Sequence, residues 1–165
     1  MSTGTFAHVV AAVDDSPSAS DVIRLAWQLA DEGGRISVVH VLGGPPFTES
    51  FVAAIGAAFG GSPLVDNTES HREIAEALLA SVAEDIPGAE AVVLDSHDAD
   101  SAPDALVRWA EDEDADAIVA ATHGGAIDHA VRLTGSFSGH LVRHAPCPVM
   151  LLPPDVTYDD GDDEA

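Results

Sequence analysis

Five short apolar runs recur along the chain, and segments of helical periodicity separate them. The first run is "FAHVVAAV" at residues 6–13, and the last is "CPVMLLP" at residues 147–153. Each run has the length of a strand that is buried on both faces of a sheet. Strands that alternate with helices predict a parallel sheet with right-handed crossover helices on both faces. Because 165 residues suit one domain, we expect a single-domain α/β three-layer sandwich with a five-stranded parallel sheet.

Turn and cap signals place the boundaries of these elements. Ser18 and Asp21 stand three residues apart, as in a capping box, and Gly33 with Gly34 marks the end of the first helix. Residues 43–68 allow either a short helix or a flap, because Pro and Gly flank an apolar island there. The expected strands are 6–13, 35–42, 89–96, 116–123 and 147–153, and the expected helices are 18–32, 69–85, 104–113 and 136–144.

The charge of the chain is extreme. Twenty-nine acidic residues face six basic ones, all arginine, which leaves a formal net charge of -23. Because 46% of the residues are hydrophobic, this charge indicates an acidic surface over a folded core and not a disordered chain. Molar salt screens such repulsion, so we expect a protein from the cytoplasm of a halophilic archaeon. Nucleic acid and anionic membranes need a basic surface, so neither is expected as a partner.

Compartment and domain limits follow from the remaining composition. Cys147 is the only cysteine, so it cannot form a disulfide within the chain. The first ten residues lack the pattern of a signal peptide, and no apolar stretch approaches the length of a membrane span. We expect a cytoplasmic domain over residues 1–153, followed by an acidic disordered tail over residues 154–165.

One segment, "ATHGGAIDHAVRLTGS" at residues 121–136, has the composition of an anion-binding loop. It follows a strand and leads into a helix, so its backbone N–H groups and hydroxyls can converge on a phosphate at the helix N-terminus. The alternative is structural: the glycines form a tight turn and a serine caps the helix. A Walker loop is excluded, because it requires a lysine and the chain has none.

Four segments together resemble the universal stress protein family, over about residues 6 to 153. They are "VVAAVDDSPSASDVIRLAWQLA", "ISVVHVL", "DADAIVAATHG" and "GSFSGHLVRHAPCPVMLL", in that order. The resemblance implies a small α/β domain of the adenine nucleotide alpha hydrolase type, many of whose members bind ATP and form homodimers. The ATP-binding members share the pattern Gly, two residues, Gly, nine residues, Gly, then Ser or Thr.

The chain departs from this pattern at two points. Ala121 replaces the first glycine, and ten residues instead of nine separate Gly124 from Gly135. Counting from Gly125 restores nine residues but places Thr122 at the first glycine. If the position of Ala121 requires a positive φ or a close approach of the ribose, its methyl group opposes binding. The pocket is therefore expected to have a degenerate motif.

The resemblance implies a nucleotide site and a dimer interface. The nucleotide, ATP with Mg²⁺, would contact residues of four segments, and the fifth strand would pair with its twofold mate. The implied nucleotide-binding residues are Ala12, Val13, Asp14, Val41, Ala121, Gly124, Gly135, Ser136, Phe137 and Ser138. The implied dimer strand consists of Val149, Met150, Leu151 and Leu152.

Three functions remain open at this point. The protein is either a dimeric binding and interaction module that has lost tight nucleotide binding, a functional ATP-binding stress protein, or a slow nucleotide hydrolase. We expect a regulatory binding protein and not an enzyme, because no nucleophile with a partnered base stands out. A zinc site at His140 and His144, with His123 and His129 upstream, is the weakest alternative, and no metal is expected.

Overall fold

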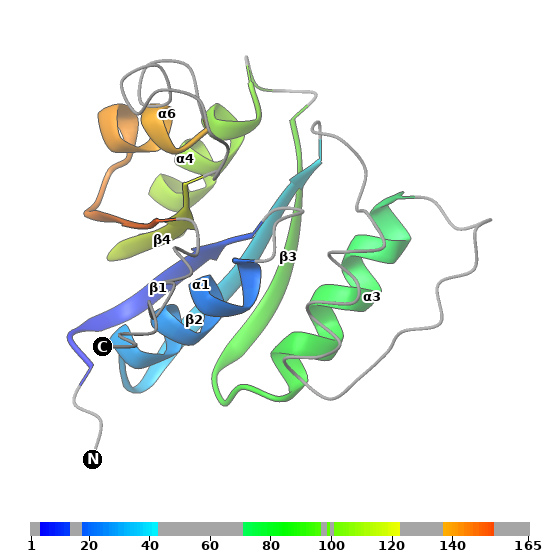
Figure 1. Ribbon diagram of the computed structural model, residues 1–165, viewed down its shortest axis with the longest axis vertical. Coiled ribbons are helices and arrows are strands. Elements are labelled where there is room, and N and C mark those ends of the chain that lie inside the picture. Colours follow the sequence, from blue (N-terminus) through cyan, green and yellow to red (C-terminus); the bar gives the residue numbers. More distant parts are fainter. Residues whose placement is uncertain are drawn as a thin grey trace, which may run out of the picture.

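The computed structural model describes residues 4–13, 18–42, 71–96, 99, 101–122 and 137–153. In this part of the chain, five parallel strands form one sheet in the order β3-β2-β1-β4-β5 (Figure 1). The strands are β1 (Phe6–Ala12), β2 (Ala30–Leu42), β3 (Ala89–Asp95), β4 (Ala117–Ala121) and β5 (Val149–Leu152). The helices are α1 (Ala19–Leu29), α3 (His71–Glu84), α4 (Ala102–Asp112) and α6 (Phe137–His144). The predicted fold class is confirmed.

The helices form a layer on each face of the sheet. Figure 1 shows α1 and α3 on one face and α4 with α6 on the other. Neighbouring residues of β1 pack into different cores: Val9 lies in the core under α1 and α3, and Val10 lies in the core under α4 and α6. Both side chains are fully buried. This is the burial that a continuous apolar strand predicts for a sheet covered on both faces.

The first helix ends earlier than predicted. It stops at Leu29, and Ala30 is already extended, with φ -67° and ψ 139°. The register of β2 against β1 then jumps from Phe6↔Ala30 to His8↔Arg35, so that residues 31–34 form a bulge. Gly33 has a φ of +81° in this bulge. The two glycines therefore serve the bulge and not the helix end.

The predicted capping box at Ser18 is also wrong. Ser18 is the N-cap of α1, but its side chain makes no capping hydrogen bond, and Asp21 instead pairs with Arg24 at 2.8 Å. A side-chain N-cap hydrogen bond does occur at α4, which starts at Ala102 and not at the predicted residue 104. There, Ser101 Oγ accepts from the Asp104 N–H at 3.4 Å and donates to Asp104 Oδ2 at 2.6 Å.

Candidate functional site

The order of the strands reverses between β1 and β4, which lie side by side at the centre of the sheet. In open α/β sheets, ligands bind outside the carboxyl ends of the strands at such a reversal. Ala12 pairs with Ala120 in this region, and Ala121 is the last residue of β4. The Ala12 and Ala120 side chains are buried in the core under α4 and α6, and Ala121 is partly exposed at the end of β4.

The four helices of the described residues all begin at this same end of the sheet. Each of them follows one strand and leads back to the start of the next parallel strand, so its N-terminus lies at the carboxyl end. Unpaired N–H groups and the helix dipole make helix N-termini favourable for anions. The carboxyl end of the sheet is therefore suited to a negatively charged ligand.

The structure describes six of the ten predicted site residues. Ala12 and Val13 lie at the end of β1, Ala121 at the end of β4, and Val41 near the end of β2. Phe137 and Ser138 open α6, and the Ser138 side chain is buried. The remaining four, Asp14, Gly124, Gly135 and Ser136, lie outside the described residues, as does the predicted segment 43–68.

The backbone at the end of β1 is held by β2. The Val13 N–H donates to the Val39 carbonyl at 2.9 Å, and the Val13 carbonyl lies 3.0 Å from His40 Nδ1. Because a carbonyl only accepts, His40 Nδ1 carries the hydrogen in this contact. The Val41 side chain is 8% exposed and packs in the core under α4 and α6, so at most its backbone faces a ligand.

The end of β4 is held by β5 in a similar way. The N–H and hydroxyl of Thr122 both donate to the Leu152 carbonyl, at 2.8 and 3.1 Å. Ala121 is not among the described residues with positive φ, which removes backbone strain as a cost at this position. Alanine at this position can therefore oppose a ligand only through the volume of its methyl group. His40 and Thr122 were not predicted as site residues, because their partners are distant in sequence.

A charged contact joins α4 and α6 near their N-terminal ends. His140 Nε2 lies 2.8 Å from Asp104 Oδ1, a distance that permits an ion pair when the ring is protonated. The hydrogen bond from Ser101 holds the pKa of Asp104 below its usual value, against the opposing effect of burial, and His140 lowers it further. The side chain of Asp104 therefore stays ionised, and is engaged within the protein, close to the proposed ligand end of the sheet.

Neither a metal centre nor a membrane helix occurs among the described residues. No group of three His, Cys, Asp or Glu side chains there could hold a metal ion; the zinc alternative is not tested, because His123 and His129 lie outside the described residues. The described helices are all too short or too polar to span a membrane. One cavity of about 360 Å³ lies beside Trp27 and Pro87, at the amino end of the sheet and thus away from the carboxyl ends of the strands.

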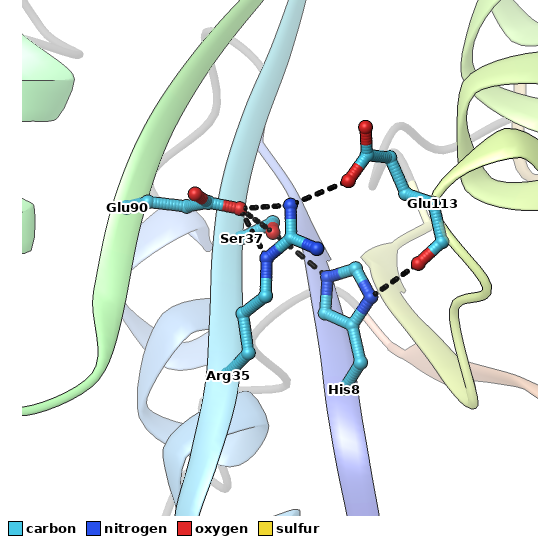
Figure 2. Close-up of polar contacts among 5 residues, drawn as sticks. All are labelled: His8, Arg35, Ser37, Glu90 and Glu113. Carbon is cyan, nitrogen blue, oxygen red and sulfur yellow. Dashed lines mark hydrogen bonds and ion pairs between the residues drawn. The ribbon is translucent and has the colours of Figure 1, made fainter.

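A second group of polar side chains lies at the amino end of the sheet, opposite the carboxyl ends of the strands. We call it the amino-end cluster; it comprises His8, Arg35, Ser37, Glu90 and Glu113 (Figure 2). His8 Nε2 lies 2.8 Å from Ser37 Oγ, a distance typical of a nucleophile and its base. Ser37, however, is completely buried, so no substrate reaches its hydroxyl. The cluster is therefore not a catalytic site for an external substrate.

The sequence model of the universal stress protein family matches residues 5–153. The chain belongs to this family. No curated protein matches the sequence.

Solved structures share the fold at low sequence identity. A universal stress protein in complex with cAMP is 20% identical, with a TM-score of 0.56, and the match covers 90% of this chain and 98% of that protein. The universal stress protein from Archaeoglobus fulgidus is 23% identical, with a TM-score of 0.54 and coverages of 87% and 91%. A universal stress family protein from Arabidopsis thaliana with AMP bound is 17% identical, with a TM-score of 0.56 and coverages of 94% and 96%.

Proposed function

We propose that this protein is a regulatory binding module of the universal stress protein family, which takes an adenine nucleotide at the carboxyl end of its sheet. The observation that carries the proposal is the junction of β1 and β4, where the strand order reverses and two alanines pair. Helix N-termini converge on the same end and favour the phosphates of such a ligand. The proposed role is binding and not turnover.

The ligand class is supported by relatives of the same fold. One is a universal stress protein in complex with cAMP, and another holds AMP. In this chain, the backbones of Val13 and Val41 would lie against the adenine, and the start of α6 at Phe137 and Ser138 would lie near the phosphates. Mg²⁺ with ATP remains part of the proposal, since the net charge of -23 makes a bare polyphosphate costly to bind.

Isothermal titration with Mg-ATP, AMP and cAMP in molar KCl tests this proposal. A nucleotide should also be released when protein purified in high salt is denatured and its extract is chromatographed. No heat at millimolar ligand together with no extracted nucleotide would overturn nucleotide binding and leave the interaction module as the function.

Two substitutions at one position examine the degenerate motif. The Ala121→Gly variant removes the methyl group from the end of β4 and should tighten binding about tenfold, the effect of one misfitting methyl group in a pocket. The Ala121→Val variant adds volume at the same place and should weaken binding. If both variants bind as the wild type does, the nucleotide does not approach the end of β4.

We also propose a homodimer through β5. This strand has only β4 as a partner among the described strands, and its four apolar residues are only partly buried. An edge strand of this kind presents unpaired N–H and C=O groups that a twofold mate can pair.

The direction of the β5 hydrogen bonds selects the test residue. The carbonyls of Pro148 and Leu152 accept from β4, so by alternation the backbone of Leu151 points away from β4. The Leu151→Pro variant removes an outward N–H and should shift sedimentation equilibrium toward the monomer, whereas Leu151→Val keeps that N–H and should remain dimeric. A dimeric proline variant would contradict pairing through this strand.

A hydrolase is the second candidate function, and it rests on the nucleotide-binding resemblance alone. Phosphate release from ATP by purified protein, measured against a blank in molar KCl, decides it. Release above the blank would replace the binding-only function with an enzyme. Release equal to the blank leaves the binding module.

A further inference from the structure

The amino-end cluster contains a buried histidine with an acceptor on each side. The His8 ring is 6% exposed, and Ser37 has no exposed surface. His8 Nδ1 lies 3.1 Å from the Glu113 backbone carbonyl, and Nε2 lies 2.8 Å from Ser37 Oγ. Ser37 Oγ in turn lies 2.7 Å from Glu90 Oε1 (Figure 2). These three contacts form a chain across β1, β2 and β3.

The hydrogens in this chain can be counted from the chemistry of each group. A carbonyl oxygen only accepts, so the hydrogen between His8 and Glu113 belongs to Nδ1. Glu90 Oε1 also accepts from Arg35 Nε at 2.6 Å, as expected of an ionised carboxylate. Since an ionised carboxylate only accepts, the one hydrogen of the Ser37 hydroxyl goes to Glu90. Ser37 Oγ must then accept from His8 Nε2, so both ring nitrogens carry hydrogen.

The charges that surround the ring favour the same state. Arg35 of β2 is a cation that lies between Glu90 of β3 and Glu113, with N···O distances of 2.6 Å to each. Asp116, in the turn before β4, accepts the backbone N–H of His8 at 2.9 Å. Trp109 of α4 contacts the ring edge-on, with 6.2 Å between the ring centroids. Three carboxylates thus face one guanidinium, and a second cation reduces the imbalance.

We propose that the His8 ring is held with hydrogens on both nitrogens, as an imidazolium, and that this charge makes the amino end of the sheet sensitive to pH. When the ring loses its Nε2 hydrogen, the Ser37 hydroxyl can donate either to His8 or to Glu90, but not to both. One buried hydrogen bond is then lost. The stability that the cluster contributes is complete while the ring is charged and falls as the pH rises.

Nuclear magnetic resonance of protein with ¹⁵N-labelled histidine tests the proton count on the wild type. An unperturbed histidine is mostly neutral at about pH 7.5, because its proton dissociates near about 6.5. At that pH, we expect hydrogens on both His8 nitrogens. A His8 ring with one hydrogen would overturn the proposal.

Urea unfolding at several pH values tests whether the protein loses stability when the His8 ring loses its Nε2 hydrogen. Between about pH 6 and about pH 9, the unfolding equilibrium constant of the wild type should rise more than about tenfold, because a ring that keeps both hydrogens at about pH 7.5 holds its proton at least about one pH unit longer than a histidine of the unfolded chain. The His8→Gln variant, whose amide donates at every pH, should lack this rise, and the matched His144→Gln variant should retain it.

A rise in His8→Gln equal to that of the wild type would contradict the proposal. If His8→Gln does not fold, the proton count on the wild type decides alone. The proposal is independent of nucleotide binding, because the cluster lies at the opposite end of the sheet.

Discussion

Two glycines with almost the same positive φ differ in what surrounds them, and the difference predicts their response to alanine. Gly33 and Gly88 have φ of +81° and +80°. A Cβ at Gly33 meets no atom within 4 Å, whereas a Cβ at Gly88 would lie 2.6 Å from the Gly34 carbonyl oxygen. Ordinary contact begins at 3.4 Å, so β2 and β3 would have to separate by several tenths of an ångström. The Gly88 carbonyl also accepts from the Ile36 N–H at 3.0 Å, a bond that this movement weakens.

The expected loss of unfolding free energy has two sources: the positive φ, which both variants share, and the backbone collision, which occurs only at Gly88. A left-handed alanine costs about 1 to 2 kcal/mol, of which the reduced entropy of the unfolded chain returns about 0.4 to 1 kcal/mol. Gly33→Ala should therefore lower the free energy of unfolding by about 1 kcal/mol. Gly88→Ala adds the backbone collision and a weakened hydrogen bond, so its loss should be about 3 kcal/mol.

Urea unfolding in molar KCl, followed by tryptophan fluorescence, measures both variants under the same conditions. The informative quantity is the difference between them, because the cost of the left-handed conformation is common to both. Equal losses for Gly33→Ala and Gly88→Ala would refute the close approach of β2 and β3 at Gly88.

Three further predictions concern caps and titrating groups. Ser101→Ala should cost about 1 kcal/mol in urea unfolding, and Ser18→Ala less than about 0.5 kcal/mol, because only Ser101 makes a capping hydrogen bond; equal costs would contradict the cap assignment. Although burial acts to raise it, hydroxyl and guanidinium donors hold the pKa of Glu90 below its ordinary 4.5. The ionised Glu90 side chain therefore stabilises the folded state above about pH 4.5, and this contribution is lost as the pH falls through the lower pKa of the folded protein. The urea midpoint of Glu90→Gln should therefore fall less steeply in acid than that of the wild type. Burial first, and the charge of Asp116 second, raise the pKa of Cys147, so iodoacetamide should alkylate it more slowly than free cysteine at the same pH, and Asp116→Asn should speed the reaction.

The fold could be predicted because its main signal is local. Each apolar run of the sequence became a strand, and the helical periodicity between runs became helices. The end of the first helix could not be predicted, because glycine marks both helix ends and bulges. Only the pairing of β2 with β1 shows that Gly33 and Gly34 belong to a bulge. Likewise, Ser18 and Ser101 have similar local sequences, but only Ser101 donates to an aspartate.

The location of the candidate site rests on the general rule that ligands of parallel sheets gather at the reversal of strand order, and it stays a prediction. The amino-end cluster could not be predicted, because its members come from three strands and a turn, with His8 and Glu113 separated by 105 positions. One signal did exist: His8 is a polar side chain within an otherwise apolar run. A buried polar residue needs partners, and the sequence does not reveal which they are.

The bulge at residues 31–34 has a practical consequence for experiments on this protein. It projects from the amino end of the sheet, and Glu32 within it is exposed. A fluorophore attached through Glu32→Cys would sit at the far end of the sheet from the proposed ligand. The native thiol at Cys147 is partly buried and has a raised pKa, so a maleimide dye would label the introduced cysteine first. The bulge therefore offers an attachment point from which assembly and unfolding can be followed in single molecules.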